Sequence, residues 1–204
     1  MEQNHVAYDF AVVAVGASLG GVAAMDELFA ALPRDIPAAI VAVLHVGPTS
    51  VLPNILNRRS TFAAAHARQG EALRAGQIYV APPDHHMLVE RGSLMLTRGP
   101  KVNWVRPAID SLFYTVAMSC GPSVIGVLLT GRLNDGTIGL GEIKRRGGVA
   151  MVQDPSDAFC GEMPTNALKH VAVDYSVPLK DMPPLLDRVA RQIATQGRKA
   201  VGRE

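Results

Sequence analysis

Continuous apolar runs are the feature that most constrains the fold of this 204-residue chain. Their residues do not alternate between apolar and polar, as the residues of a half-exposed strand do. A strand that is buried on both faces has such a run, and strands of this kind form parallel sheets that helices cover on both sides. Five clear runs and a weaker sixth are predicted to be strands: residues 10–15, 38–44, 77–81, 124–129, 149–152 and, more weakly, 170–173.

Amphipathic segments separate these runs. In the first of them Val22, Met25, Leu28 and Phe29 recur with the period of an α-helix. Strands that alternate with helices form βαβ units with right-handed crossovers. Helices are predicted over residues 21–32, 108–118, 137–146 and 181–193.

The middle of the chain breaks this alternation. Two short segments, 86–90 and 93–97, flank Arg91-Gly92 and are typical of a β-hairpin. We therefore expect a three-layer α/β fold, with a doubly wound, mostly parallel sheet, helices on both faces and a β-hairpin insertion. No repeat or linker interrupts the chain, so one domain is expected over residues 10–195, with tails at 1–9 and 196–204.

Charge and composition argue against several classes of function. The chain has 20 basic and 18 acidic side chains, and its net charge of +2 gives no strong attraction to nucleic acid or to a membrane surface. Residues 111–131 carry no charge, but Gly121-Pro122-Ser123 interrupts them, which favours a helix, a turn and a strand over a membrane span. Cys120 and Cys160 lie outside any metal or redox motif, which is typical of a protein of the reducing cytoplasm.

Asp84, His85 and His86 form a candidate metal site. Neighbouring residues on a strand point to opposite faces, so two adjacent histidines rarely bind the same ion. We therefore expect no metal, and no other cofactor.

The first predicted strand runs directly into a helix through a glycine-rich turn, Gly16-Ala17-Ser18-Leu19-Gly20-Gly21. The turn fits the G-x-S-x-G pattern, in which a serine nucleophile stands on a tight turn and the helix N-terminus offers N–H groups to an oxyanion. Two alternatives stay open. One is a phosphate-binding turn, although Ser18 occupies the second glycine of the G-x-G-x-x-G pattern. The other is a plain turn with a capping serine.

Two other polar residues follow predicted strands. His45 comes directly after the run 38–44, and Asp135 lies between the run 124–129 and a helix. Ligands of open α/β sheets bind outside the carboxyl ends of the strands, so Ser18, His45 and Asp135 are expected at one edge. Together they supply a nucleophile, a base and an orienting carboxylate, although each alone also fits a structural role. The order Ser, His, Asp disfavours the α/β-hydrolases, in which the acid precedes the histidine.

Taken together, these motifs resemble the catalytic domain of the CheB protein-glutamate methylesterases of bacterial chemotaxis. The turn 16–21 matches the family's G-A-S-x-G-G, and His45 stands where the family has its strand-end histidine. The resemblance covers about residues 10–195 and rests on seven motifs in the family's order. The other five motifs are Ala81-Pro82-Pro83-Asp84 with His86-Met87, Val102-Asn103 with Arg106-Pro107, Asp110-Ser111-Leu112-Phe113, Leu129-Thr130-Gly131 with Asn134-Asp135-Gly136, and Gln153-Asp154-Pro155 with Met163-Pro164.

The resemblance implies a serine esterase that hydrolyses γ-methyl esters of glutamate on the methylated cytoplasmic helices of chemoreceptors. The products are the free carboxylate and methanol, and the same site would also deamidate receptor glutamines. Ser18 is expected to attack the ester, His45 to transfer the proton, and Asp135 to orient the imidazole. The residues expected to form the oxyanion hole and the pocket are Leu19, Gly131, Arg132 and Met163.

Further residues near these motifs are expected to meet the receptor or to border the site. Arg106 is predicted to steer an acidic receptor surface, with a structural ion pair as the alternative. Trp104 is predicted either to contact a helical partner or to pack in the core. An acidic loop beside the site is expected from Asp154, Asp157 and Glu162. The oligomeric state is left open.

This chain departs from the family's pattern at three positions. Leu19 replaces the usual threonine after the serine, and Arg132 and Leu133 replace the methionine and glycine of T-G-M-G-x-D-G. Since leucine does not easily take a positive φ, we expect a different loop here. The departure at Arg132 and Leu133 leaves open a non-catalytic adaptor that binds receptors or signalling partners. A nucleotide-binding module, suggested by the glycine-rich turn alone, is a third hypothesis.

Typical family members also carry an N-terminal receiver domain that accepts a phosphate. Here Met1 stands about nine residues before the first predicted strand. The sequence is expected to be a stand-alone esterase or an excised fragment, and the starting Met1 favours the first; either way we expect no control by phosphorylation in the same chain.

Overall fold

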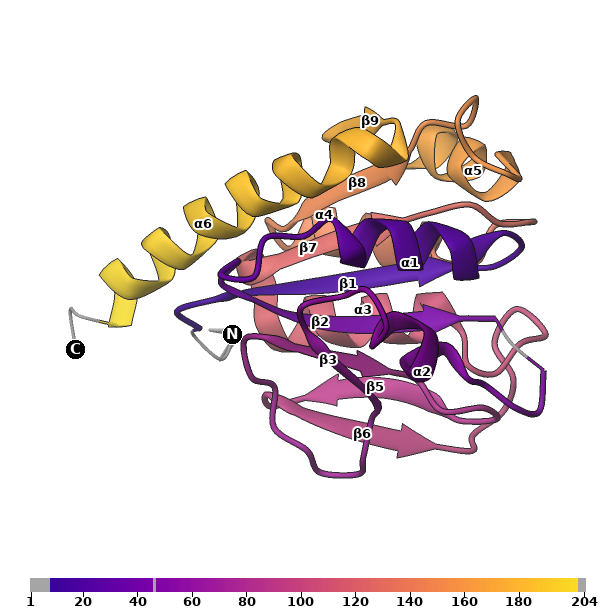
Figure 1. Cartoon of the computed structure of the whole chain (residues 1–204), viewed down its shortest axis with the longest axis horizontal. Helices are drawn as coiled ribbons and strands as arrows, with labels where there is room; N and C mark the ends of the chain where they lie inside the picture. Colours follow the sequence, from indigo (N-terminus) through magenta and orange to yellow (C-terminus); the bar gives the residue numbers. More distant parts are fainter. Residues whose placement is uncertain (1–7, 46, 202–204) are drawn as a thin grey trace.

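The computed structural model describes residues 8–45 and 47–201, and its centre is a seven-stranded sheet (Figure 1). The strands lie in the order β3-β4-β2-β1-β7-β8-β9, and every neighbouring pair is parallel. The sheet reverses its direction of growth between β1 and β7, which makes the end of β1 a topological switch point. The strands are β1 (Ala11–Ala17), β2 (Ala38–Leu44), β3 (Ala63–His66), β4 (Gln77–Val80), β7 (Val124–Leu128), β8 (Val149–Gln153) and β9 (Tyr175–Val177).

Helices cover both faces of the sheet, as the sequence predicts. Figure 1 looks onto the sheet with α1 on the near side and α3 on the far side. One apolar core contains residues of α1 (Gly21–Ala30), α2 (Leu52–Leu56) and α6 (Met182–Val201). The opposite core contains residues of α3 (Ile109–Cys120), α4 (Thr137–Arg145) and α5 (Glu162–His170). Short 3-10 helices at Gly121–Ser123 and Leu179–Asp181 lead into β7 and α6.

Burial on both faces explains why the strand sequences are continuously apolar. All seven residues of β1 are buried. Val13 and Val15 belong to the core under α1 and α6, whereas Val12 and Ala14 belong to the core under α3. Since successive side chains of a strand point to opposite faces, both sets must be apolar.

The predicted hairpin forms β5 (His86–Glu90) and β6 (Ser93–Thr97), an antiparallel pair outside the main sheet. It packs on α3, where the backbone N–H of Val89 donates a hydrogen bond to the Thr115 hydroxyl at 3.1 Å. Met87 and Leu94 are fully buried at this contact. The hairpin therefore extends the layer of α3.

The sixth predicted strand, at residues 170–173, is wrong. His170 ends α5, residues 171–174 form an irregular segment, and β9 begins at Tyr175. Val171 and Val173 pack against the core from this segment, so their apolar character reflects burial without strand pairing.

Other elements differ from the sequence-based expectations in extent or existence. The short elements α2 and β3 were not predicted, and α5 begins at Glu162 inside the expected acidic loop. Helix α6 continues to Val201, past the expected domain end at 195. Gly197 lies inside this helix, and a Cβ there would overlap the Tyr8 carbonyl, so the close approach of Tyr8 requires a glycine at this position.

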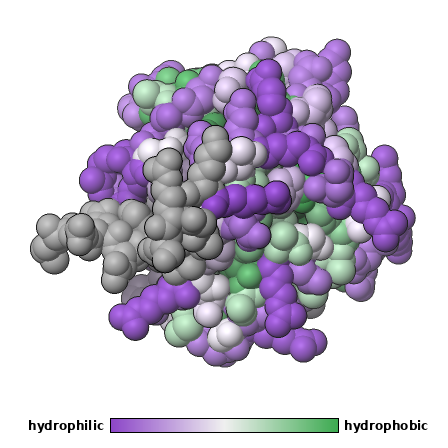
Figure 2. Space-filling model, turned by 90° about the vertical axis from the view of Figure 1, so that its left-hand side faces the viewer, coloured by the Kyte–Doolittle hydropathy of each residue, from purple (hydrophilic) through white to green (hydrophobic). Residues whose placement is uncertain are grey.

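The side of the molecule at which the parallel strands begin differs from the side at which they end. The left-hand side of Figure 1, where β1 begins, is turned toward the viewer in Figure 2 and is mainly hydrophilic, with small apolar areas scattered over it. Within residues 8–45 and 47–201, no helix is both long and apolar enough to cross a membrane. The predicted functional residues lie on the opposite side, where the parallel strands end.

Candidate active site

The structure brings Ser18, His45 and Asp135 together at the carboxyl ends of three adjacent strands. Ser18 follows β1, His45 follows β2 on one side of it, and Asp135 follows β7 on the other. The Ser18 hydroxyl donates to Nδ1 of His45 at 3.1 Å, and Nε2–H of His45 donates to Oδ2 of Asp135 at 2.8 Å. The Asp135 side chain is 4% exposed and that of His45 is 16% exposed, so water competes weakly for these hydrogen bonds.

The turn after β1 holds Ser18 in place. The Ser18 N–H donates to the carbonyl of Thr130 at 3.0 Å, and the Ser18 carbonyl accepts from the N–H of Gly21 at 2.9 Å. Gly20 has a φ of +83°, and a Cβ there would lie 2.7 Å from Cβ of Phe159. The turn therefore needs a glycine at position 20 for its conformation and its space.

Asp135 accepts four hydrogen bonds. Besides His45, its Oδ2 accepts from the N–H of Ile109 at 2.7 Å, while Oδ1 accepts from the N–H of Asp110 at 3.1 Å and the amide of Asn103 at 2.8 Å. Burial opposes ionisation, but the bonds from His45, Ile109 and Asn103 outweigh it and hold the pKa of Asp135 below its usual range. The first N–H groups of α3 also offer it the positive end of the helix dipole. Asp135 is therefore an ionised partner for His45.

Sequence reasoning assigned no role to Asn103 or Asp110, although both stand in the motifs that carry the family resemblance. Asp110 is only 7% exposed and accepts hydrogen bonds from Asn103 and from the N–H of Gly139, both at 2.8 Å. Burial raises the pKa of Asp110 to about 6, helped by the charge of Asp135 and opposed by these hydrogen bonds. The signal in the sequence was a carboxylate in the first turn of an apolar helix, which a capping role explains equally well.

Two backbone N–H groups beside Ser18 are available for an oxyanion. Among the described residues, the N–H groups of Leu19 and Arg132 have no hydrogen-bond partner. The N–H of Gly131 donates to the carbonyl of Cys160 at 3.0 Å and is occupied. Helix α1 also begins at Gly21 and directs its N-terminus toward this region.

Gly131 and Met163 are buried beside Ser18 and are not among the residues that line the cavity described below. A Cβ on Gly131 would lie 2.9 Å from Cβ of Ser18 and 2.5 Å from Cε of Met163. Met163 is fully buried, and its N–H donates to the Gly131 carbonyl at 2.9 Å. Only a glycine at 131 lets this loop pass so close to Ser18.

In the loop after Gly131, Leu133 adopts a left-handed backbone conformation, which glycine takes most easily. Leu133 has a φ of +64°, and its carbonyl accepts a hydrogen bond from the amide of Asn166 at 2.7 Å. Its side chain is largely exposed, so the left-handed backbone meets no packing clash. Arg132 points to solvent, with its side chain 71% exposed and Nε 4.0 Å from Glu162.

Arg106 adopts the alternative that the sequence left open, a structural ion pair. Its guanidinium donates to Asp84 at 2.5 and 2.9 Å and to the carbonyls of Arg98 and Gly99 at 2.9 and 2.6 Å. The pair holds the pKa of Asp84 below its usual range. Because Arg106 already has these partners and is 18% exposed, it braces the loops beside the hairpin and is poorly placed to bind a receptor.

The two histidines of the candidate metal site have other partners. His85 donates from Nδ1 to the carbonyl of Pro83 at 2.9 Å. His86 donates from Nε2 to the carbonyl of Pro100 at 3.0 Å and accepts from the N–H of Ala108 at 3.2 Å. In the part of the chain that the structure describes, no group of three His, Cys, Asp or Glu side chains is arranged to hold a metal.

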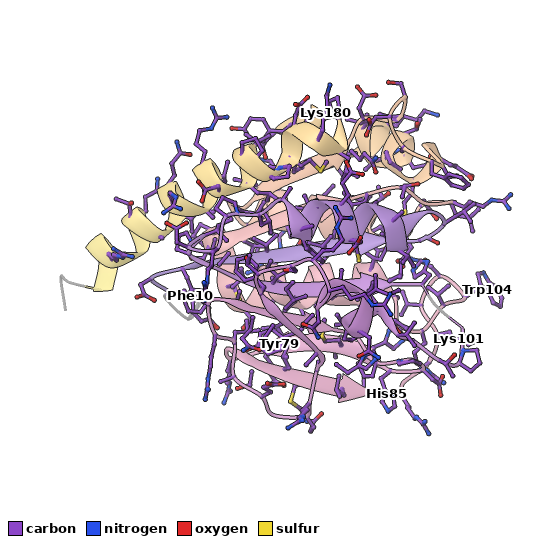
Figure 3. The ribbon with its side chains drawn as sticks, viewed as in Figure 1. Phe10, Tyr79, His85, Lys101, Trp104 and Lys180 are labelled. Carbon is purple, nitrogen blue, oxygen red and sulfur yellow. The ribbon has the colours of Figure 1, made fainter. Side chains whose placement is uncertain are left out.

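A cavity of about 450 Å³ opens over the triad. Its lining includes Ser18 and His45 together with Asn103, Trp104 and Leu133. Trp104 is 92% exposed, and Figure 3 shows it projecting outward from the edge at which the strands end. Trp104 therefore stands at the mouth of the cavity and does not pack in the core.

A serine, a histidine and a buried carboxylate joined by hydrogen bonds, with free N–H groups beside the serine, form the arrangement of a serine hydrolase. Here it is mounted on a parallel α/β sheet. The chain belongs to the CheB methylesterase family, whose sequence profile matches residues 13–186.

Relatives and a solved structure agree with this assignment. A Leptospira interrogans protein, provisionally named protein-glutamate methylesterase/protein-glutamine glutaminase, is 36% identical over 89% of this chain and 95% of its own length. A Pyrococcus abyssi protein of that name is 36% identical over 91% of this chain, which spans about half of it (52%). The crystal structure of the Thermotoga maritima CheB methylesterase catalytic domain matches with a TM-score of 0.84 and 31% identity, over 88% of this chain and 98% of that one.

Proposed function

We propose that this protein hydrolyses glutamate γ-methyl esters on the methylated cytoplasmic helices of chemoreceptors, and that it deamidates glutamines at the same kind of position. The observation that carries the proposal is the unbroken hydrogen-bond chain from the Ser18 hydroxyl through His45 to Asp135. Family membership supplies the substrate class. The proposed site of action is the cytoplasm, where the receptor helices lie.

The first half of the reaction forms an acyl-enzyme. Oγ of Ser18 attacks the ester carbonyl carbon while its proton passes to Nδ1 of His45, and the carbonyl electrons move to oxygen. The N–H groups of Leu19 and Arg132 stabilise that oxyanion. Collapse of the intermediate breaks the bond to the methoxy oxygen, which takes the proton from His45 and leaves as methanol.

The second half hydrolyses the acyl-enzyme. His45 takes a proton from water as the water oxygen attacks the acyl carbon, and then returns a proton to Oγ of Ser18. Asp135 is ionised throughout and stabilises the imidazolium that forms twice in each cycle. With a glutamine side chain the leaving group is ammonia, and the remaining steps are the same.

The rim of the site supports a polypeptide substrate over a small ester. Leu19, Trp104, Leu133 and Phe159 are large apolar side chains, and each is at least 47% exposed. Leu19 belongs to the turn that carries Ser18, Trp104 and Leu133 line the cavity, and Phe159 packs against that turn at Gly20. Apolar groups gathered around a catalytic cavity are typical of a surface that binds a partner.

The intact geometry favours an enzyme over a non-catalytic adaptor. The adaptor hypothesis rested on Arg132 and Leu133. Within residues 8–45 and 47–201 the backbone N–H groups of Leu19 and Arg132 have no partner, and Leu133 takes a positive φ of +64°. The substitutions therefore change the rim of the cavity and leave its catalytic atoms in place.

The test is methanol release from a methylated chemoreceptor fragment. We expect release by the wild type and a rate several orders of magnitude lower for Ser18→Ala, because triad residues act as a unit. Ser123→Ala, a serine at the opposite end of β7, is the control and should keep the wild-type rate. An adaptor predicts no methanol from any of the three proteins.

A further inference from the structure

We propose that Asn103 is a positioning residue for the triad, which fixes the carboxylate of Asp135 by bridging it to the buried carboxylate of Asp110. The inference rests on the proposed esterase function, in which Asp135 orients His45. It gives a role to two residues outside the Ser18–His45–Asp135 chain.

The bridge uses both donors of one amide nitrogen. Nδ2 of Asn103 lies 2.8 Å from Oδ1 of Asp135 and 2.8 Å from Oδ2 of Asp110. A carboxamide is neutral and carries two N–H groups on one atom, so it satisfies two acceptors without adding charge. An aspartate at 103 would have the same shape but only acceptors.

The two carboxylates need a donor between them. Asp135 and Asp110 are 3% and 7% exposed, and burial of two neighbouring anions is unfavourable without hydrogen bonds. The raised pKa of Asp110 reflects this burial and the nearby charge of Asp135. Asn103 is the side chain that touches both anions.

The backbone around Asn103 is held in an uncommon conformation. Asn103 and Trp104 have φ values of +52° and +66°, and Val102 and Val105 exchange hydrogen bonds of 3.2 and 3.0 Å across them. Positive φ at both central residues is the pattern of a type I′ turn, in which asparagine is favoured first and glycine second. A tryptophan at the second position is unfavourable, so the anchored Asn103 side chain helps to hold the turn at the mouth of the cavity.

Loss of the bridge would loosen Asp135 specifically. Its Oδ1 would keep only the 3.1 Å bond from the N–H of Asp110, and the carboxylate could rotate away from His45. A hydrogen bond to a charged group is worth about one to two powers of ten in an equilibrium, and water replaces part of it because Asn103 is exposed. We therefore expect about a 10-fold loss of kcat with little change in KM.

The test compares Asn103→Gly with Asn103→Asp on p-nitrophenyl acetate, a small neutral ester that does not need the apolar rim. Glycine takes a positive φ freely, so Asn103→Gly removes the amide without straining the turn. Aspartate preserves the shape but places a third acceptor against two carboxylates. Rates are normalised to the amount of folded enzyme by titrating Ser18 with a fluorophosphonate.

We expect Asn103→Gly to lower kcat about 10-fold at pH 8, and Asn103→Asp to lower it further. The titratable groups that face position 103 are Asp110 on α3, Asp135 before α4 and, behind Asp135, His45. As the pH falls from 8 to 6, one of the three carboxylates takes up a proton and becomes a donor. The activity of Asn103→Asp relative to wild type should therefore rise on the acid side.

A matched control separates this role from a general loss of stability. Asn57 also makes two 2.8 Å hydrogen bonds through its amide, to the backbone of Ala64, far from the triad. Asn57→Ala should lower the unfolding temperature and leave kcat and the pH profile unchanged. If Asn103 only shapes the turn, Asn103→Asp will be as active as or more active than Asn103→Gly at pH 8, and the proposal is overturned.

A second readout does not depend on catalysis. The ring proton between Nε2 of His45 and Asp135 gives a downfield nuclear magnetic resonance signal when that bond is fixed. We expect the signal in the wild type, its shift or loss in both Asn103 variants, and its retention in Asn57→Ala. An unchanged signal in the Asn103 variants would refute the positioning role. Absence of Ser18-dependent hydrolysis by the wild type would instead count against the proposed function.

Discussion

Replacement of Gly131 by alanine tests how closely the structure constrains the nucleophile. The new Cβ would lie 2.5 Å from Cε of Met163 and 2.9 Å from Cβ of Ser18. The Met163 terminus is flexible and can move, but Ser18 is tied through its backbone to Thr130 and Gly21. Restoring an ordinary contact of about 3.4 Å requires Ser18 or the loop to shift by about 0.5 Å.

The expected magnitudes follow from this displacement. Overpacking of one methyl group costs about 1–3 kcal/mol, which lowers Tm by roughly 2–12 °C in a chain of this size. A misplacement of about 1 Å can lower a rate about 100-fold, so half of that displacement predicts about a 10-fold lower kcat for Gly131→Ala.

Urea unfolding and p-nitrophenyl acetate hydrolysis measure the two effects. Gly141→Ala in α4 is the matched control, since its Cβ would meet only Cγ2 of Val171, at 3.8 Å. Alanine should stabilise that helix by about 0.5–1 kcal/mol and leave the rate unchanged. Wild-type stability and rate in Gly131→Ala would show that the close approach to Ser18 does not constrain the site.

Three further predictions concern the same edge of the sheet. First, the raised pKa of Asp110 means that its folded form binds a proton more tightly than its unfolded form, so its contribution to stability falls as the pH rises from about 4 to 6. Asp110→Ala should remove this part of the pH dependence in urea unfolding, and an identical pH dependence in both proteins would contradict it. Second, Leu133→Gly relieves a left-handed leucine backbone that costs about 1–2 kcal/mol, but it also adds flexibility to the unfolded chain. We therefore expect a net stabilisation of about 0.5 kcal/mol in urea unfolding. A clear destabilisation would mean that the exposed leucine side chain makes stabilising contacts. Third, Arg132→Met should change KM for methylated receptor more than KM for p-nitrophenyl acetate. This difference should shrink as the salt concentration rises, because the guanidinium is exposed. If KM changes equally for both substrates, Arg132 has no role in receptor recognition.

The sequence was most informative where one physical cause fixed the pattern. Burial on both faces produced the continuous runs of β1, β2 and β7, and these strands place Ser18, His45 and Asp135 at their ends. The same logic failed at 170–173, because apolar residues under a helix layer look like a weak strand. The four-residue β3 contains three alanines and a histidine, which carry little strand signal.

Side-chain partners were harder to predict than strand positions. Arg106 stands in a family motif, yet its partner Asp84 is 22 residues away, and sequence spacing does not reveal that pair. Asn103 and Asp110 carry no catalytic pattern of their own and acquire a role only when the start of α3 meets Asp135. At Leu133 the residue type itself was misleading. Leucine disfavours a positive φ, but a hydrogen bond from Asn166 to its carbonyl helps to hold that backbone conformation.

The position of β1 between β2 and β7 has a consequence for how the protein acquires activity during folding. Its triad hydrogen bonds join residues that are 27 and 90 positions apart, and both depend on pairings of β1 with its two neighbours. Closing such long loops is slow compared with forming helices. Esterase activity should therefore return later in refolding than the helical signal does, and it would serve as a stringent reporter of the completed sheet.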